Sequence, residues 1–90
     1  MANVFTKDPD ARLDYQWDWS DWLAEGETIT NIVIIVPDGI TLDEQSDTDT
    51  TVTVWLIGGT DGEGYKLTCH ITTSAAREDD RSIYINCRER

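Results

Sequence analysis

Apolar and polar residues alternate along most of the chain. In the segment 13–19, Leu13, Tyr15, Trp17 and Trp19 occupy every second position. Successive side chains of a strand point to opposite faces, so this period of two predicts a strand with one buried face. The same pattern predicts three further strands, at 51–57, 65–72 and 83–87.

Two more strands are predicted by composition rather than by alternation. Thr28 to Val36 is rich in β-branched residues and contains no charge, which favours a central strand buried on much of both faces. Ile40 to Leu42 forms a short strand after the turn residues of 37–39. Between the strands, 43–49 and 73–80 are predicted to be polar loops.

One short helical turn is expected at Ser20 to Leu23. Ser20 is a suitable N-cap residue, and Gly26 is suited to end the turn. Tyr65 opens a strand directly after a glycine-rich connection, which resembles the tyrosine corner of immunoglobulin-like folds.

Together these elements predict an all-β fold, an immunoglobulin-like antiparallel β-sandwich of about six to seven strands with one short helical turn. Residues 12–90 are expected to form this single domain. Residues 1–11 show little periodicity and are expected to form an extended N-terminal arm, either ordered and docked on a neighbouring subunit or simply disordered.

Charge narrows the functions that remain possible. The 90 residues carry 7 Lys and Arg against 18 Asp and Glu, for a net charge of −11. Nucleic acids and anionic membranes both require a basic surface, so neither is an expected partner. The acidity is uneven, because residues 1–64 hold 14 acids and 2 bases whereas residues 65–90 hold 4 acids and 5 bases.

Length and hydropathy add three expectations. A chain of this size supports one modest core rather than a deep active site. The longest apolar run, Ile32 to Val36, is far short of the roughly 20 residues that span a membrane. Met1 to Asp10 lacks the apolar stretch of a secretory signal, so synthesis in the cytoplasm is expected.

The two cysteines lie on the apolar faces of the last two predicted strands. If the loop between these strands is centred near Glu78, Cys69 and Cys87 fall almost opposite each other. A disulfide is then one alternative. A pair of reduced, buried thiols is the other, and a reducing cytoplasm favours it.

No catalytic residue, cofactor site or metal site is predicted. His70 alternates with apolar neighbours and is expected to point outward. The glycine-rich segment 58–64 lacks the Lys-Ser/Thr of a phosphate-binding loop. The carboxylates of 43–49 could bind Ca²⁺, but the calcium-loop pattern is absent and a solvated acidic loop is the simpler interpretation.

The order of motifs resembles a group of small virion proteins of tailed bacteriophages, described as fiber-tail adaptors. The resemblance covers about residues 5–90. Its first half rests on Lys7-Asp8-Pro9-Asp10-Ala11, Leu13-Asp14-Tyr15, Trp17-Asp18-Trp19-Ser20 and Trp22-Leu23. Its second half rests on Val54-Trp55-Leu56, Gly58-Gly59-Thr60, Tyr65-Lys66-Leu67-Thr68-Cys69, Ile71-Thr72-Thr73 and Arg77 to Ile83. Ala76 stands where the group often has Gly, which argues against a positive-φ turn there.

The resemblance implies an immunoglobulin-like sandwich that acts as a non-enzymatic structural protein joining tail components. It would be made in the host cytoplasm and located in the virion, with other virion proteins and copies of itself as partners. The alternatives are a capsid decoration protein, a head-tail joining protein and, because Trp17, Trp19 and Trp22 could stack on sugars, a carbohydrate-binding module. The residues expected to contact partners are Asp8, Pro9, Trp22, Asp43, Glu44, Asp47, Arg77 and Arg81, the two arginines pairing with a neighbouring copy.

Overall fold

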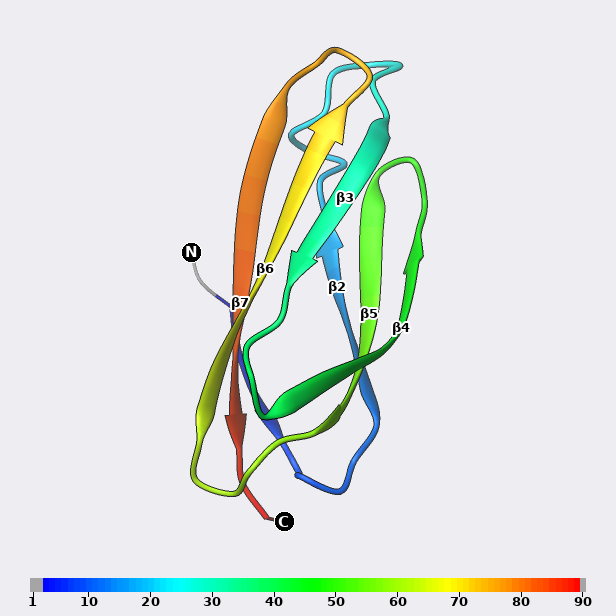
Figure 1. Cartoon of the computed structure of the whole chain (residues 1–90). Helices are drawn as coiled ribbons and strands as arrows, with labels where there is room; N and C mark the ends of the chain where they lie inside the picture. Colours follow the sequence, from blue (N-terminus) through cyan, green and yellow to red (C-terminus); the bar gives the residue numbers. More distant parts are fainter. Residues whose placement is uncertain (1–2, 90) are drawn as a thin grey trace.

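The computed structural model describes residues 3–89, which form seven strands and no helix (Figure 1). That part of the chain therefore contains no helix able to cross a membrane. The strands are β1 (Asn3–Lys7), β2 (Leu13–Asp18), β3 (Ile29–Ile35), β4 (Ile40–Asp47), β5 (Thr51–Gly58), β6 (Gly64–Thr73) and β7 (Glu78–Cys87).

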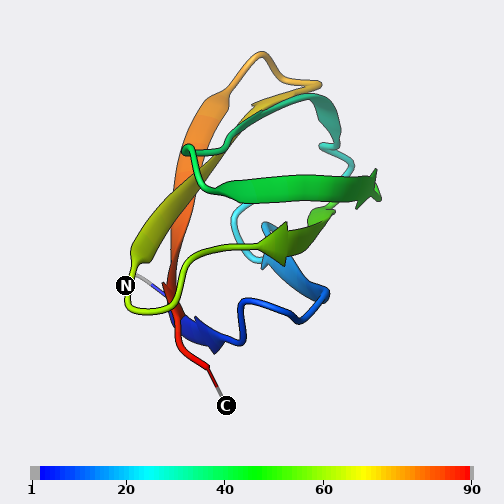
Figure 2. The same cartoon turned by 60° about the horizontal axis from the view of Figure 1, so that its bottom comes forward.

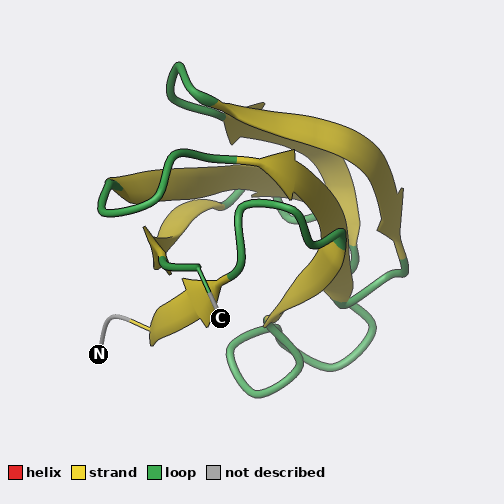
Figure 3. Cartoon of the chain, turned by 90° about the horizontal axis from the view of Figure 1, so that it is seen from below, coloured by secondary structure: helices red, strands yellow, loops and turns green. Residues whose placement is uncertain are grey.

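The strands form two layers, as Figure 3 shows from below. One sheet has the order β1-β7-β6-β3 and the other the order β2-β5-β4. All neighbouring strands are antiparallel except β1 and β7, which pair in parallel. This arrangement confirms the predicted β-sandwich.

Two contacts show which edges of the sheets face each other. The rings of Phe5 in β1 and Tyr15 in β2 lie 4.9 Å apart. Trp19, which follows β2, donates from its indole Nε1 to the carboxylate of Asp79 in β7 at 2.9 Å. Strands β1 and β2 therefore lie on one side of the sandwich, and β3 and β4 lie on the other.

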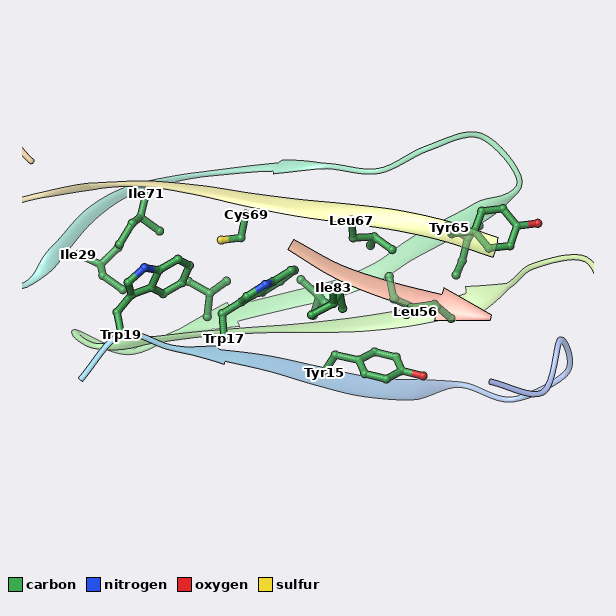
Figure 4. Packing of buried hydrophobic residues seen from close by; sticks show 14 of the residues in the cluster. Tyr15, Trp17, Trp19, Ile29, Leu56, Tyr65, Leu67, Cys69, Ile71 and Ile83 are labelled. Atoms are coloured by element: carbon green, nitrogen blue, oxygen red, sulfur yellow. The ribbon is translucent and has the colours of Figure 1, made fainter. Parts of the chain in front are cut away.

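The core lies between the sheets and consists of the side chains that the alternation placed on one face of each strand (Figure 4). Trp17 and Trp19 are buried, and from β5 and β6 Leu56 and Leu67 are fully buried. The rest of the core is Tyr15, Ile29, Ile40, Val52, Val54, Tyr65, Cys69, Ile71, Ile83, Ile85 and Cys87.

The predicted tyrosine corner is present at one end of the sandwich. The backbone amide of Thr60 donates to the hydroxyl of Tyr65 at 2.9 Å, which fixes the β5–β6 connection against the start of β6. Gly39 and Gly59 lie against the Tyr65 ring, because a Cβ on either residue would contact it. The glycines thus allow the backbone to approach the ring closely.

Strand β3 is not the doubly buried central strand that its composition predicted. It is an edge strand, and the side chains of Val33 and Ile35 are 48% and 58% exposed. Ile29 at its start belongs to the core, and Ile32 and Ile34 pack against the core as partly buried side chains. An apolar sequence shows that a strand can be buried, but it does not determine how many strands lie beside it.

Two predicted polar loops are shorter than expected, because their ends join strands. The segment 43–47 belongs to β4, which pairs with β5 up to Asp47 and has an irregular register between Leu42 and Glu44. Likewise Glu78 to Asp80 opens β7. Acidic side chains are tolerated in β4 because it is an edge strand with an exposed face.

Residues 3–7 of the predicted N-terminal arm are strand β1 and belong to the larger sheet, whereas Met1 and Ala2 lie outside the described residues. In Figure 2, β1 (dark blue) lies beside the red end of β7. Lys7 is fully buried, and its Nζ donates to the carbonyl oxygens of Gly58 at 2.7 Å and Asp8 at 3.0 Å.

The expected helical turn is a single hydrogen-bonded turn, in which the amide of Leu23 donates to the carbonyl of Trp19 at 3.0 Å. The carboxylate of Asp18 accepts from the amide of Ser20 at 2.8 Å, so Asp18 rather than the predicted Ser20 provides the side-chain cap of the turn. The expectation against a positive-φ turn at Ala76 is wrong, because Ala76 adopts a φ of 62°.

The cysteines are far apart, and both are buried, reduced thiols. In the β6–β7 pairing Cys69 lies opposite Arg81, six residues along β7 from Cys87. The connection is centred near residue 75 and not near Glu78, so the expected proximity of the two cysteines is wrong.

Two tyrosine substitutions should have different effects on the free energy of unfolding. Replacing Tyr65 by Phe leaves the Thr60 amide without its acceptor and should lower the free energy of unfolding by about 1–3 kcal/mol. The hydroxyl of Tyr15 is buried without a hydrogen-bond partner among the described residues. Tyr15→Phe should therefore be neutral or stabilising by up to about 1 kcal/mol in denaturant unfolding. Equal losses for both variants would contradict this distinction.

Gly59 should not tolerate alanine. Its φ is 101°, and an added Cβ would overlap the Sγ of Cys87. Backbone strain and overpacking together should cost about 2–4 kcal/mol in denaturant unfolding. Gly62→Ala is the matched control, since Gly62 has a φ of 87° and open space around its Cβ position. Equal losses for the two variants would show that the overlap with Cys87 contributes nothing.

Candidate docking interface

The fold separates the charges of the chain between the two sheets. The strands of the β2-β5-β4 sheet contain five acids and no base. Those of the β1-β7-β6-β3 sheet contain three acids and three bases, which cancel. Of the 14 acids in residues 1–64, five therefore lie in the strands of one layer and none in the strands of the other, while the remaining nine lie in loops and turns.

Two of the predicted contact residues meet at the edge of the acidic sheet. Asp43 and Glu44 in β4 both accept from Arg12, whose Nε lies 2.7 Å from Asp43 and whose guanidinium nitrogen lies 3.3 Å from Glu44. The same guanidinium lies 4.4 Å from the ring centre of Trp55 in β5. These four residues, which we call the Arg12 cluster, form one exposed to half-buried surface.

Asp8, Pro9 and Asp47 lie outside this cluster. Asp8 and Pro9 are half-buried in the turn between β1 and β2, where the carboxylate of Asp8 accepts the amide of Asp10 at 2.9 Å. Asp47 is exposed at the far end of β4.

At the other end of the sandwich, Arg77 and Trp22 form part of a closed network. Arg77 donates two hydrogen bonds to the Glu27 carboxylate, at 2.6 and 2.9 Å, and its guanidinium lies 4.0 Å from the centre of the Trp22 ring. The side chain of Glu27 is only 4% exposed. It also accepts from the hydroxyl of Thr73 and the amide of Ala24. The network holds the β2–β3 connection against the β6–β7 turn.

Arg81 is also engaged within its own chain. It donates to the carbonyl oxygen of Asp18 at 2.7 Å, lies 3.5 Å from the Asp79 carboxylate, and stacks over Trp19 at 5.0 Å. Both arginines that were expected to face a neighbouring copy thus have partners inside the protein. Arg77 and Arg81, two of the few bases in this acidic chain, therefore join its sheets and loops.

Three members of these networks were missed at the sequence level. Arg12 and Trp55 are 43 residues apart, and Glu27 and Arg77 are 50 apart, so no local spacing connects them. One available signal was that Arg12 is the only base between residues 8 and 65.

The tryptophans do not form a platform for sugars. Trp17 and Trp19 belong to the core. Trp22 and Trp55 are partly buried, and an arginine covers each ring. A carbohydrate-binding surface requires open, accessible ring faces, so this arrangement gives that alternative no support.

The histidine of the opposite sheet is paired as well. His70 points outward from β6, and its two ring nitrogens contact the carboxylates of Asp80 and Glu78. These hydrogen bonds, with Asp80 the stronger influence, raise the pKa of His70. Within residues 3–89 no group of three or more His, Cys, Asp or Glu side chains could hold a metal ion.

The Glu27 network should make stability dependent on pH. Hydrogen bonds from Arg77, then Thr73 and Ala24, lower the pKa of Glu27 from 4.5 to about 2. The stabilisation is therefore present above pH 4.5 and is lost as the pH falls toward 2. Glu27→Gln should lower the free energy of unfolding at pH 7 and flatten its decline in that acid range.

The control is Glu25→Gln, which neutralises an exposed carboxylate of the same connection. Urea unfolding of both variants between pH 2 and pH 7 makes the comparison. An unchanged acid profile for Glu27→Gln would contradict the assigned role of Glu27.

Comparison with solved structures supports the fold. The solution structure of the PKD domain from KIAA 1837 protein matches with a TM-score of 0.53 and 16% sequence identity. The match covers 98% of this chain and 80% of that domain. At this level of identity the likeness concerns the immunoglobulin-like sandwich alone.

Comparison with protein families identifies the chain. No curated protein matches it. The model of the family described as "Podophage GP4 fiber-tail adaptor protein gp77" matches residues 7–86, which include every strand except most of β1 and the last residue of β7. The chain therefore belongs to this fiber-tail adaptor family and is a structural adaptor protein of the phage tail.

Proposed function

We propose that the protein is a non-enzymatic adaptor that docks on another tail component through the outer face and β4 edge of the β2-β5-β4 sheet. One observation carries this proposal: this sheet has five acids and no base in its strands, whereas the opposite sheet is neutral. A layer of one sign attracts a basic partner surface and repels an acidic one, which favours one orientation of the subunit.

The contact surface would be centred on the Arg12 cluster and extend to Asp47. Asp43 and Glu44 share Arg12, and the exposed Asp14 and Asp47 add further negative charge. Trp55 contributes a large half-buried ring at the centre, of the kind that anchors many protein interfaces. Asp8 and Pro9, in the turn that leads to Arg12, would lie at the rim.

The arginine networks would support docking without joining it. Arg77 and Arg81 fix the connections at the Trp22 end, so in this proposal they position the loops rather than pair with a neighbouring copy. Trp22 retains a partly exposed ring beneath Arg77 and would be a secondary contact.

Other virion proteins and copies of the same chain are the proposed partners, with synthesis in the host cytoplasm. A net charge of −11 makes copies repel one another. Contacts between copies would therefore use the neutral sheet and leave the acidic sheet for the partner.

Neutralising the acidic edge should impair assembly. In phage carrying Asp43→Asn, Glu44→Gln and Asp47→Asn together, we expect about tenfold fewer adaptor copies per virion, because the attraction to a basic partner is weakened. Quantitative mass spectrometry of purified virions measures the copies. The variant should remain folded, since all three side chains are exposed.

The matched control combines Asp21→Asn, Glu25→Gln and Asp38→Asn. It makes the same change in net charge with exposed residues of the loops. Equal incorporation of both triple variants at the wild-type level would overturn the proposed docking face.

A further inference from the structure

The four edge strands of the sandwich are protected unequally. Strand β4 carries three acids and strand β2 carries two. Charges of this kind discourage another chain from pairing with an edge. Strand β3 carries none, and the whole stretch 28–36 is without charge in a chain of net charge −11. Strand β1 also lacks an exposed charge, because its Lys7 is buried, but it has five residues against seven in β3, so β3 is the longer of the two uncharged edges.

The side chains of β3 favour the same interpretation. Val33 and Ile35 point away from the core and are 48% and 58% exposed. The pairing of β3 with β6 is regular from Asn31 to Ile35, the one irregularity lying between Ile29 and Asn31. The free edge is therefore straight enough for several ladder hydrogen bonds, and it is flanked by apolar side chains that an added strand would cover.

The surroundings of β3 specify the charge of the incoming strand. Strands β3 and β4 lie on the same side of the sandwich, opposite the side where Phe5 meets Tyr15. In Figure 2 the green β4 lies beneath the teal β3 on this side. A strand added to β3 would face the inner side of β4, where Asp47 pairs with the buried Val52, in a chain of net charge −11, so basic residues would stabilise it.

We infer that β3 accepts an extended segment of another tail protein, with alternating apolar residues flanked by lysine or arginine. The inference rests on the proposed function, because the incoming segment would be part of the basic partner that the acidic sheet requires. A second copy of this chain is the weaker candidate. Pairing β3 with β3 of a second copy would bring the acids of two β4 strands toward each other.

The test uses a synthetic peptide in which valine and threonine alternate, with two lysines at each end. Titrated into the isotope-labelled protein, it should shift and protect the backbone amides of β3 in NMR spectra. A peptide with glutamate in place of lysine should bind about tenfold more weakly. If β3 amides do not respond to the lysine peptide, the inference is overturned.

Variants of the edge make the test specific. Val33→Lys with Ile35→Lys puts like charge on the binding edge and should weaken peptide binding about tenfold. The matched control is Val4→Lys with Thr6→Lys, on exposed positions of edge strand β1, and it should bind as the wild type does. Urea unfolding of both variants verifies that they are folded.

Two outcomes would separate this inference from the proposed function. A dimer in sedimentation equilibrium that is lost in the β3 double variant, without peptide binding, would assign the edge to a second copy and overturn the inference. If virions incorporate the β3 double variant normally but not the acidic triple variant, the inference falls while the acidic docking face stands.

Discussion

Each sheet buries one face against the other, and this packing fixes which side chains point inward. Val52, Val54 and Leu56 of β5 pack in one core with side chains such as Leu67 and Ile85, and all of these are fully buried. Each such side chain contributes about 1.5–3 kcal/mol by leaving water. A small chain has few of these contacts, so inward positions are fixed by packing while outward positions remain available for charge and for partners.

Bases are scarce in this acidic protein, and three of the seven are held inside the fold. Lys7 is buried and donates to backbone carbonyls, and Arg77 donates to the carboxylate of Glu27. Arg81 of β7 contacts the end of β2, where it donates to the carbonyl of Asp18 and lies over the ring of Trp19. Arg12 alone faces the acidic sheet. Because the bases are occupied in joining loops and layers, most of the acidity at the surface is not compensated. That imbalance gives the adaptor an acidic face and a neutral face.

Much of the fold could be predicted from local pattern. The alternation of Trp17 and Trp19 with polar residues placed both on the buried face, and the position of Tyr65 after a glycine-rich connection located the tyrosine corner. Two of the predictions that were wrong concern which strands and residues lie side by side. The sequence of β3 is as apolar as that of a central strand, but the sheet order leaves it at an edge. The separation of Cys69 from Cys87 follows from a hairpin register that no residue type specifies.

Alternation was sufficient to identify the buried face of β5 and β6, because a strand with one apolar face must cover that face. The excess of acid and its place in the first two-thirds of the chain also follow from the sequence alone. Which strands share a sheet depends on packing between distant segments, and so does the placement of the acids of β2 and β4 on one layer. Contacts such as Arg12 with Asp43 and Arg77 with Glu27 join residues tens of positions apart. They exist because packing of the core brings their strands and loops together, and local periodicity carries no information about such distant pairs.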